Sequence, residues 1–192
     1  MKRKSSIIGF VLLLGLLAVF SGCSMWEVIP NPTPTPTPTP TNQDDGGINF
    51  TLPDLAGNEV TFRSFRGKPA VVFFFKSYCP HCQDEAPFLE SVYRKYQDRV
   101  TFLGVAVNEQ GISGSLIAST TAYAQQITSE FVNVYGWTFT VLIDDYGRVQ
   151  RELVGTGVPS FVFIDENGMV QGTVKDTVSQ GQLEQLIQSY LF

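Results

Sequence analysis

Beyond residue 47, long apolar runs alternate with amphipathic stretches. Residues 70–75 (AVVFFF) form a continuous apolar run of strand length, and residues 100–107 (VTFLGVAV) form the next. Such runs indicate strands that are buried on both faces of a sheet. The stretch between them predicts a helix over residues 80–96. This strand–helix–strand order is typical of a parallel pair joined by a crossover helix.

The rest of this region continues the alternation and ends in a hairpin and a helix. Residues 50–62 predict two short strands around a turn at Gly57-Asn58, and Glu166 to Gly168 predicts a second tight turn. We therefore expect an α/β fold: a mixed central sheet flanked by helices, with an N-terminal β extension and a helical insertion. The other expected elements are helices over 115–134 and 179–191 and strands over 139–144, 160–165 and 169–174.

The N-terminus has the pattern of an export signal. Lys2, Arg3 and Lys4 precede an apolar run from Ile7 to Phe20. As a helix this run spans roughly 21 Å, which is shorter than the ~30 Å hydrocarbon core of a bilayer. The following Ser21-Gly22-Cys23 resembles the lipobox of bacterial lipoproteins, although Phe20 stands where leucine is usual.

That resemblance implies a signal peptide over residues 1–22 and a lipid on Cys23. An uncleaved signal anchor with a free Cys23 is the alternative, and both interpretations place the domain extracytoplasmic and membrane-anchored. Residues 23–47 then form a linker, because alternating proline in PNPTPTPTPTPT favours polyproline II over helix. A disordered tether would differ only in stiffness. The folded domain is expected over residues 48–192.

Charge excludes one class of partner. The chain has 18 Asp and Glu against 13 Lys and Arg, and its only basic cluster lies at residues 2–4. Without a basic footprint for phosphates, we expect no nucleic-acid partner. We also expect a monomer that contacts the membrane through its lipid anchor.

Two cysteines remain once Cys23 is assigned to lipid, namely Cys79 and Cys82, and His81 is the only histidine. A structural zinc site needs four ligands, and c-type haem attachment needs histidine where this chain has Gln83. We therefore expect no metal and no cofactor. A static disulfide is the structural alternative, but a bridge closing so short a loop stabilises little. A redox-active pair remains.

The position of the pair favours redox chemistry. The cysteines follow a buried strand and open a helix, whose N-terminus stabilises a thiolate. Pro80 suits the first helical position, since its missing N–H would have no partner there. We expect Cys79 to be the exposed nucleophile and Cys82, one turn later, to resolve the mixed disulfide.

Three motifs together resemble a known family over residues 48–191. They are the lead-in FTLPDLAGNEVTFRSFRGKPAVVFFFKSYCPHC, the pattern CxxCxxExP and the segment GVPSFVFIDENG. The domain resembles the thioredoxin-like fold, and specifically the membrane-tethered TlpA/ResA/CcmG-like thiol-disulfide oxidoreductases of the AhpC/TSA-redoxin superfamily. The resemblance implies a thioredoxin-like fold and disulfide exchange with exported protein thiols or disulfides. It also implies a membrane redox partner that exchanges electrons with the cysteine pair.

The resemblance also implies individual roles. Pro159 would follow a cis bond after Val158, whose backbone would pair with a substrate peptide. Glu85 would accept or supply the resolving proton, and Pro87 would kink the helix. Tyr78 stands where thioredoxins carry tryptophan and would cover the disulfide. The alternatives are a trans proline and a solvated carboxylate at Glu85.

Pro80-His81 departs from the reducing members of this branch and matches the oxidising DsbA-like family. An imidazole near Cys79 would stabilise the thiolate and hence the reduced form. The reduction potentials of thioredoxin and DsbA differ by about 150 mV, which corresponds to roughly 7 kcal/mol for a two-electron couple. The direction of electron flow therefore stays open between reduction of apocytochromes to their thiol form and oxidation or redox repair of exported proteins. His81 as a plain surface residue is the alternative interpretation.

Two other functions compete with this interpretation. A peroxiredoxin shares the fold, but it needs threonine three residues before its reactive cysteine, where this chain has Lys76. A copper or haem chaperone would use Cys79 and Cys82 to bind its cargo rather than to transfer electrons.

Overall fold

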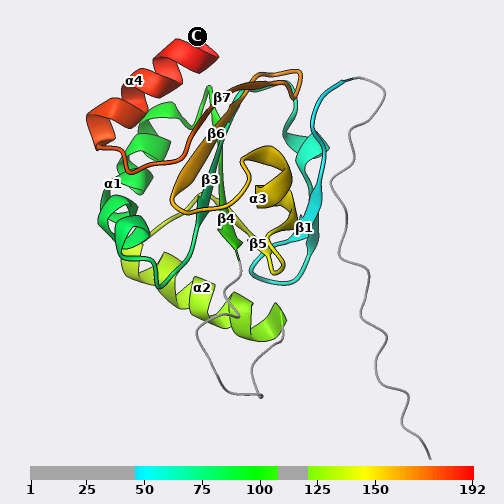
Figure 1. Ribbon diagram of the computed structural model, residues 1–192, viewed down its shortest axis with the longest axis vertical. Coiled ribbons are helices and arrows are strands. Elements are labelled where there is room, and N and C mark those ends of the chain that lie inside the picture. Colours follow the sequence, from blue (N-terminus) through cyan, green and yellow to red (C-terminus); the bar gives the residue numbers. More distant parts are fainter. Residues whose placement is uncertain (1–45, 108–120) are drawn as a thin grey trace, which may run out of the picture. The chain divides into compact units, whose positions relative to one another are not determined.

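The central element is a five-stranded mixed sheet (Figure 1). The computed structural model describes residues 46–107 and 121–192. The strand order is β5-β4-β3-β6-β7; β3, β4 and β5 are parallel, β6 is antiparallel to β3, and β7 is antiparallel to β6. The predicted mixed sheet is confirmed. The strands are β3 (Ala70–Phe75), β4 (Thr101–Val107), β5 (Thr140–Asp144), β6 (Ser160–Ile164) and β7 (Val170–Val174).

Helices lie on both faces of this sheet, as predicted (Figure 1). The predicted helix over 80–96 is confirmed, whereas the first residues of the helix predicted over 115–134 lie outside the described residues. A short helix, α3, was not predicted, because its six residues have no amphipathic pattern long enough to detect. The helices are α1 (Pro80–Tyr96), α2 (Thr121–Tyr135), α3 (Arg148–Leu153), α4 (Gln180–Leu191) and a 3-10 turn, η1 (Phe62–Phe65).

Strand β3 is buried on both sides, because its side chains alternate between two apolar cores. Phe73 and Phe75 pack in the core that α1, α2 and α4 cover. Val72 and Phe74 pack in the opposite core, which contains Val149 of α3 and residues of the N-terminal extension. Burial on both faces explains why the sequence of β3 is a continuous apolar run.

The N-terminal extension is a short antiparallel hairpin of β1 (Thr51–Pro53) and β2 (Glu59–Thr61). Gly57 has φ of +87° in the connecting turn, a conformation that glycine adopts without strain, and the Asp54 N–H donates to the Asn58 carbonyl at 2.9 Å. Leu52 is fully buried in the second core. Both the hairpin and its turn were predicted.

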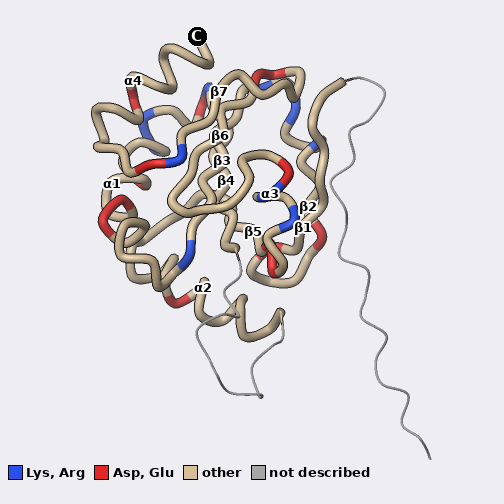
Figure 2. Tube along the Cα trace, in the orientation of Figure 1, with Lys and Arg blue, Asp and Glu red and all other residues tan. Residues whose placement is uncertain are grey.

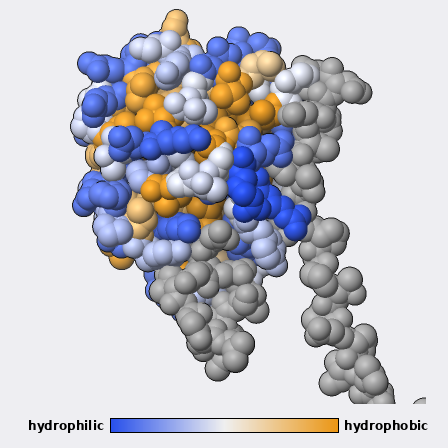
Figure 3. All heavy atoms as spheres, viewed as in Figure 1, coloured by the Kyte–Doolittle hydropathy of each residue, from blue (hydrophilic) through white to orange (hydrophobic). Residues whose placement is uncertain are grey.

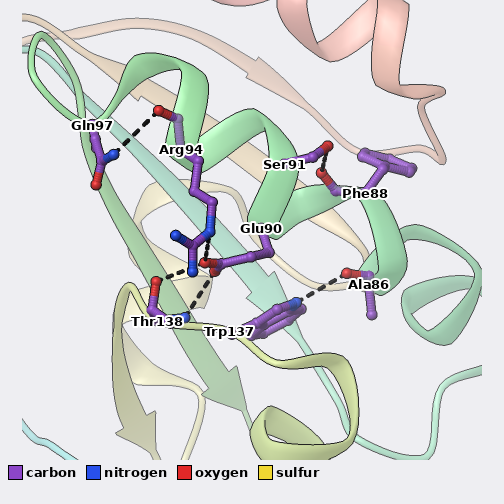
Figure 4. Close-up of polar contacts among 8 residues, drawn as sticks. All are labelled: Ala86, Phe88, Glu90, Ser91, Arg94, Gln97, Trp137 and Thr138. Atoms are coloured by element: carbon purple, nitrogen blue, oxygen red, sulfur yellow. Dashed lines mark hydrogen bonds and ion pairs between the residues drawn. The ribbon is translucent and has the colours of Figure 1, made fainter.

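Polar contacts of Trp137 and Thr138 join α1 to the chain segment that precedes β5 (Figure 4). Trp137 packs edge-on against Phe75 and donates its indole N–H to the Ala86 carbonyl at 2.9 Å. Glu90 of α1 accepts hydrogen bonds from both the backbone N–H and the hydroxyl of Thr138, at 2.8 and 2.7 Å. These contacts hold the middle of the helix against the sheet and so fix the position of its N-terminus.

The surface is mixed in polarity. On the face seen in Figure 3, hydrophobic side chains reach the surface mainly in the middle, and hydrophilic side chains surround them. Among residues 46–107 and 121–192, the helices are too short or too polar to cross a bilayer. The signal segment, Cys23 and the linker up to residue 45 lie outside the described residues.

Candidate active site

Cys79 occupies the N-cap of α1, directly after β3, and Pro80 is the first residue of the helix. The Cys79 N–H donates to the Lys76 carbonyl at 3.1 Å, and its own carbonyl accepts from the Gln83 N–H at 3.0 Å. The turn therefore holds the thiol at the positive end of the helix dipole, where a thiolate is stabilised.

The two cysteines are free thiols in different environments. Cys79 is half-buried, whereas Cys82 is fully buried. Burial strongly raises the pKa of Cys82, and the neighbouring Cys79 and Glu85 raise it further, although a backbone hydrogen bond from Lys76 opposes them. Cys82 is therefore a protonated thiol at neutral pH, and a base must remove its proton before it can attack a disulfide.

The peptide bond between Val158 and Pro159 is cis, as predicted. The Val158 carbonyl accepts from Cys79 Sγ at 3.8 Å, across 79 positions in the sequence. Sheet pairing causes this approach: Phe74 of β3 lies opposite Ser160 of β6, so the end of one strand meets the segment that precedes the other. The backbone beside Cys79 is thereby positioned where a substrate peptide could lie.

Glu85 lies one turn beyond Cys82 and is only 2% exposed. Its Oε1 accepts from the Val178 N–H at 2.6 Å, and its Oε2 has no hydrogen-bond partner among the described residues. Burial raises the pKa of Glu85 to about 7, with smaller contributions from the charges of Asp176 and Asp84, while the Val178 N–H opposes the rise. Glu85 is therefore a buried carboxyl group and not the solvated carboxylate that was the alternative interpretation of the sequence.

A groove of about 480 Å³ runs past Glu85, between the first turns of α1 and the start of α4. His81 is exposed on the wall of this groove. The groove gives the Glu85 carboxyl a route for proton exchange with solvent. Its lining residues are His81, Asp84, Glu85, Phe88, Thr177, Val178, Ser179, Gln180 and Gln182.

The predicted site residues of the folded domain come together around Cys79. Tyr78 is 38% exposed beside the cysteine, with Lys76 Nζ 5.6 Å from its ring centre. Pro87 lies inside α1. The predicted lipid site, Cys23, lies outside the described residues. Within the described ranges there is no group of three or more His, Cys, Asp and Glu side chains that could hold a metal ion.

Sequence reasoning missed the residues that support the cis-proline loop. Gln150 donates from Nε2 to the Gly157 carbonyl at 2.6 Å. Asp144 accepts from the N–H groups of Arg148 and Gln150 at 2.9 and 3.0 Å, and so caps α3. The sequence Asp144-Asp145-Tyr146-Gly147 contains the acidic and glycine residues of a turn before a helix, which was the available signal. The Val178 N–H that donates to Glu85 belongs to the backbone, so the identity of the residue at position 178 gives no sign of this contact.

Known proteins share this architecture. The model of the AhpC/TSA family matches residues 45–173. The thiol-disulfide oxidoreductase ResA of Halalkalibacterium halodurans is 28% identical over 145 residues, which cover 75% of this chain and 72% of ResA.

Two solved structures extend the comparison. The structure of MTB DsbF is 32% identical, with a TM-score of 0.60, and the match covers 73% of this chain and 94% of DsbF. A secreted Mycobacterium tuberculosis disulfide oxidoreductase, homologous to E. coli DsbE, is 29% identical with a TM-score of 0.59. That match covers 73% of this chain and 95% of the other.

The fold and these relatives define a thiol-disulfide oxidoreductase of the thioredoxin fold. The chain belongs to the AhpC/TSA family and is similar to its ResA-like oxidoreductases.

Replacing Glu85 with Gln should change how stability depends on pH. The folded protein holds the Glu85 proton up to a pKa of about 7, whereas the unfolded chain releases it near 4.5. Wild-type stability therefore falls as pH rises through this window, and Glu85→Gln should gain up to about 3 kcal/mol relative to wild type by pH 8. Urea unfolding of the reduced proteins from pH 4.5 to 8 measures the difference.

The exposed Glu59→Gln is the matched control and should show no such divergence, because solvent surrounds its carboxylate. Stability curves for wild type and Glu85→Gln that stay parallel across the window would contradict the raised pKa.

Proposed function

We propose that the protein is a lipid-anchored, extracytoplasmic oxidoreductase that exchanges disulfides with exported proteins through Cys79 and Cys82. The observation that carries the proposal is the unequal burial of the two thiols. The half-exposed Cys79 lies 3.8 Å from the cis-proline loop, and the fully buried Cys82 lies beside the buried Glu85. One thiol can meet a protein substrate, and the other can react only with Cys79.

The proposed reaction has two balanced steps. The Cys79 thiolate attacks a substrate disulfide, which forms a mixed disulfide and releases one substrate thiolate. Glu85 then takes the proton of Cys82, whose sulfur attacks Cys79 Sγ and releases the second substrate thiolate. The substrate is reduced and the Cys79–Cys82 pair is oxidised. The same steps in reverse oxidise a substrate dithiol.

The substrate peptide would lie along the cis-proline loop. In that position the Val158 backbone, just before the start of β6, offers hydrogen-bonding groups to an extended chain beside Cys79. Tyr78, which is exposed and directly precedes Cys79 in the chain, would contact the same peptide. We assign the substrate-binding role to Tyr78, Val158 and Pro159.

Anchoring rests on the N-terminal sequence. The basic residues 2–4, the apolar run and Cys23 match a lipoprotein signal, and the Pro/Thr-rich linker over residues 23–47 would hold the domain away from the membrane. The M. tuberculosis relative is described as secreted, which supports an extracytoplasmic location. A membrane redox partner would then restore the pair after each turnover.

Pro80 and His81 favour the oxidising direction. A histidine at the second helical position can stabilise the reduced, thiolate form, and a stabilised reduced form makes the disulfide a stronger oxidant. The likeness to ResA-like proteins supports the reducing direction, with apocytochrome disulfides as substrates and their thiols as products. The peroxidase alternative is disfavoured because Lys76 stands where a peroxiredoxin needs threonine. A metal or haem chaperone would have to bind its cargo with the two thiolates of Cys79 and Cys82 alone.

Replacing Cys82 with Ser should trap substrates. Without the resolving sulfur, mixed disulfides on Cys79 persist, so exported proteins should be recovered covalently attached to the variant. Glu85→Gln should accumulate the same adducts transiently, because the resolving step loses its base. Non-reducing electrophoresis with mass spectrometry of membrane extracts detects them.

A Cys79→Ser/Cys82→Ser variant is the control and should capture nothing through the active site. Failure of Cys82→Ser to form any adduct in cells would contradict the proposed exchange.

The redox potential should separate the two directions. If Pro80-His81 sets the potential, equilibration with glutathione should place the wild-type pair above about −200 mV, closer to DsbA near −120 mV than to thioredoxin near −270 mV. His81→Ala should then lower the potential. A wild-type value below about −250 mV would contradict the oxidant role and favour reduction of apocytochrome disulfides to thiols.

A further inference from the structure

A second, smaller cavity opens beside the cis-proline loop and shares no lining residue with the Glu85 groove. Its volume is about 130 Å³, well below the ~300–1,000 Å³ of typical small-molecule sites, so it suits one side chain rather than a cofactor. The proposed chemistry of the cysteines makes no use of it. Its lining residues are Lys76, Gln150, Arg151, Thr156, Gly157 and Val158.

This cavity adjoins the reacting thiol through two of its lining residues. The Val158 carbonyl accepts from Cys79 Sγ, and the Lys76 carbonyl accepts from the Cys79 N–H. A peptide whose sulfur reaches Cys79 would therefore place a neighbouring residue at the mouth of the cavity.

Sheet topology gathers positive charge around the loop. Phe74 lies opposite Ser160 and Phe161 lies opposite Val174, so β3 and β7 end on either side of the start of β6. Lys76 directly follows β3, and Lys175 directly follows β7. Figure 2 shows Lys and Arg positions on α3 and at these strand ends, around the connection that leads into β6.

The basic side chains lie close to the loop backbone. Lys175 Nζ is 3.4 Å from the point that a Cβ on Gly155 would occupy. Arg151 lines the cavity, and its Nη1 donates to the Tyr146 carbonyl at 2.6 Å, which restricts the guanidinium. Lys76, which follows β3, also lines the cavity.

Acidic residues also lie near the loop. Asp144 interacts electrostatically with Arg151, but its carboxylate is fully buried and accepts hydrogen bonds from backbone N–H groups. Burial raises the pKa of Asp144. Glu152 is exposed beside Arg151 on α3. Asp176 is exposed directly after Lys175 and raises the pKa of Glu85. Among the residues that line the cavity, Lys76 and Arg151 are charged, and no acidic residue lines it.

We propose that this cavity is a specificity subsite, in which Lys76 and Arg151 bind a carboxylate side chain located within two residues of the reacting cysteine of the substrate. The inference rests on the proposed function, in which substrates dock on the cis-proline loop and react at Cys79. Partial enclosure makes a charge pair there stronger than on the open surface.

The test uses hairpin peptides, each closed by one disulfide and differing only in the residues beside their cysteines: Glu, Gln or Lys. The reduced full-length chain in detergent is mixed with each peptide, and the second-order rate constant for peptide reduction is measured. The Glu peptide should react roughly three- to tenfold faster than the Gln peptide, and the Lys peptide more slowly than either. Raising the salt concentration should shrink the differences.

Substitutions identify the source of the preference. Lys76→Gln/Arg151→Gln should give equal rates for the three peptides, and Lys76→Glu/Arg151→Glu should reverse the order. Lys68→Gln is the matched control, because Lys68 is exposed just before β3, at the opposite end of the strand from Lys76, and should keep the preference.

Equal rates for the three peptides with wild type would overturn the subsite, as would a preference that survives the double Gln substitution. A preference of the wild-type protein that does not shrink as the salt concentration rises would also overturn it, and this measurement relies on no variant. Absence of reaction with the neutral Gln peptide is a distinct result, because it would contradict the proposed exchange at Cys79 itself.

Discussion

The antiparallel pairing of β3 with β6 is the constraint on which the rest of the site depends. It sets Phe74 opposite Ser160 and so brings the Val158–Pro159 segment against Cys79. A shift of one residue in this register would turn every buried side chain of β6 to the other face of the sheet. Because both cores are densely apolar, the register is strongly specified.

The difference in burial between the two thiols then gives them different roles in disulfide exchange. The same helix turn leaves Cys79 at the surface and places Cys82 in the core, where a thiolate is costly. Glu85 shares that environment, and its pKa of about 7 lets the carboxyl both hold and release a proton near neutral pH. The single hydrogen bond from Val178 leaves one oxygen of this carboxyl without a partner among the described residues, which is consistent with a group that exchanges protons.

Much of this architecture could be predicted from local sequence. The apolar run of β3, the helix over 80–96 and the glycine turns follow from short-range rules, and the motifs indicated Cys79, Cys82, Glu85 and Pro159. The remaining features depend on distant contacts. The Val178 amide meets Glu85 across 93 positions, and α3 depends on a buried Asp144 that sequence pattern alone could not place. The basic cavity also escaped prediction, because Lys76 and Arg151 are neighbours only through the strand order.

The central claim is that the two thiols have unequal access, so that Cys79 alone meets the substrate. Site-resolved alkylation tests it most directly: the reduced full-length protein is treated with iodoacetamide under native conditions, and mass spectrometry follows each cysteine over time. Cys79 should be modified at least about tenfold faster than Cys82, and Cys82 should become reactive only when urea unfolds the domain. Modification of both cysteines at similar rates in the native protein would contradict the account.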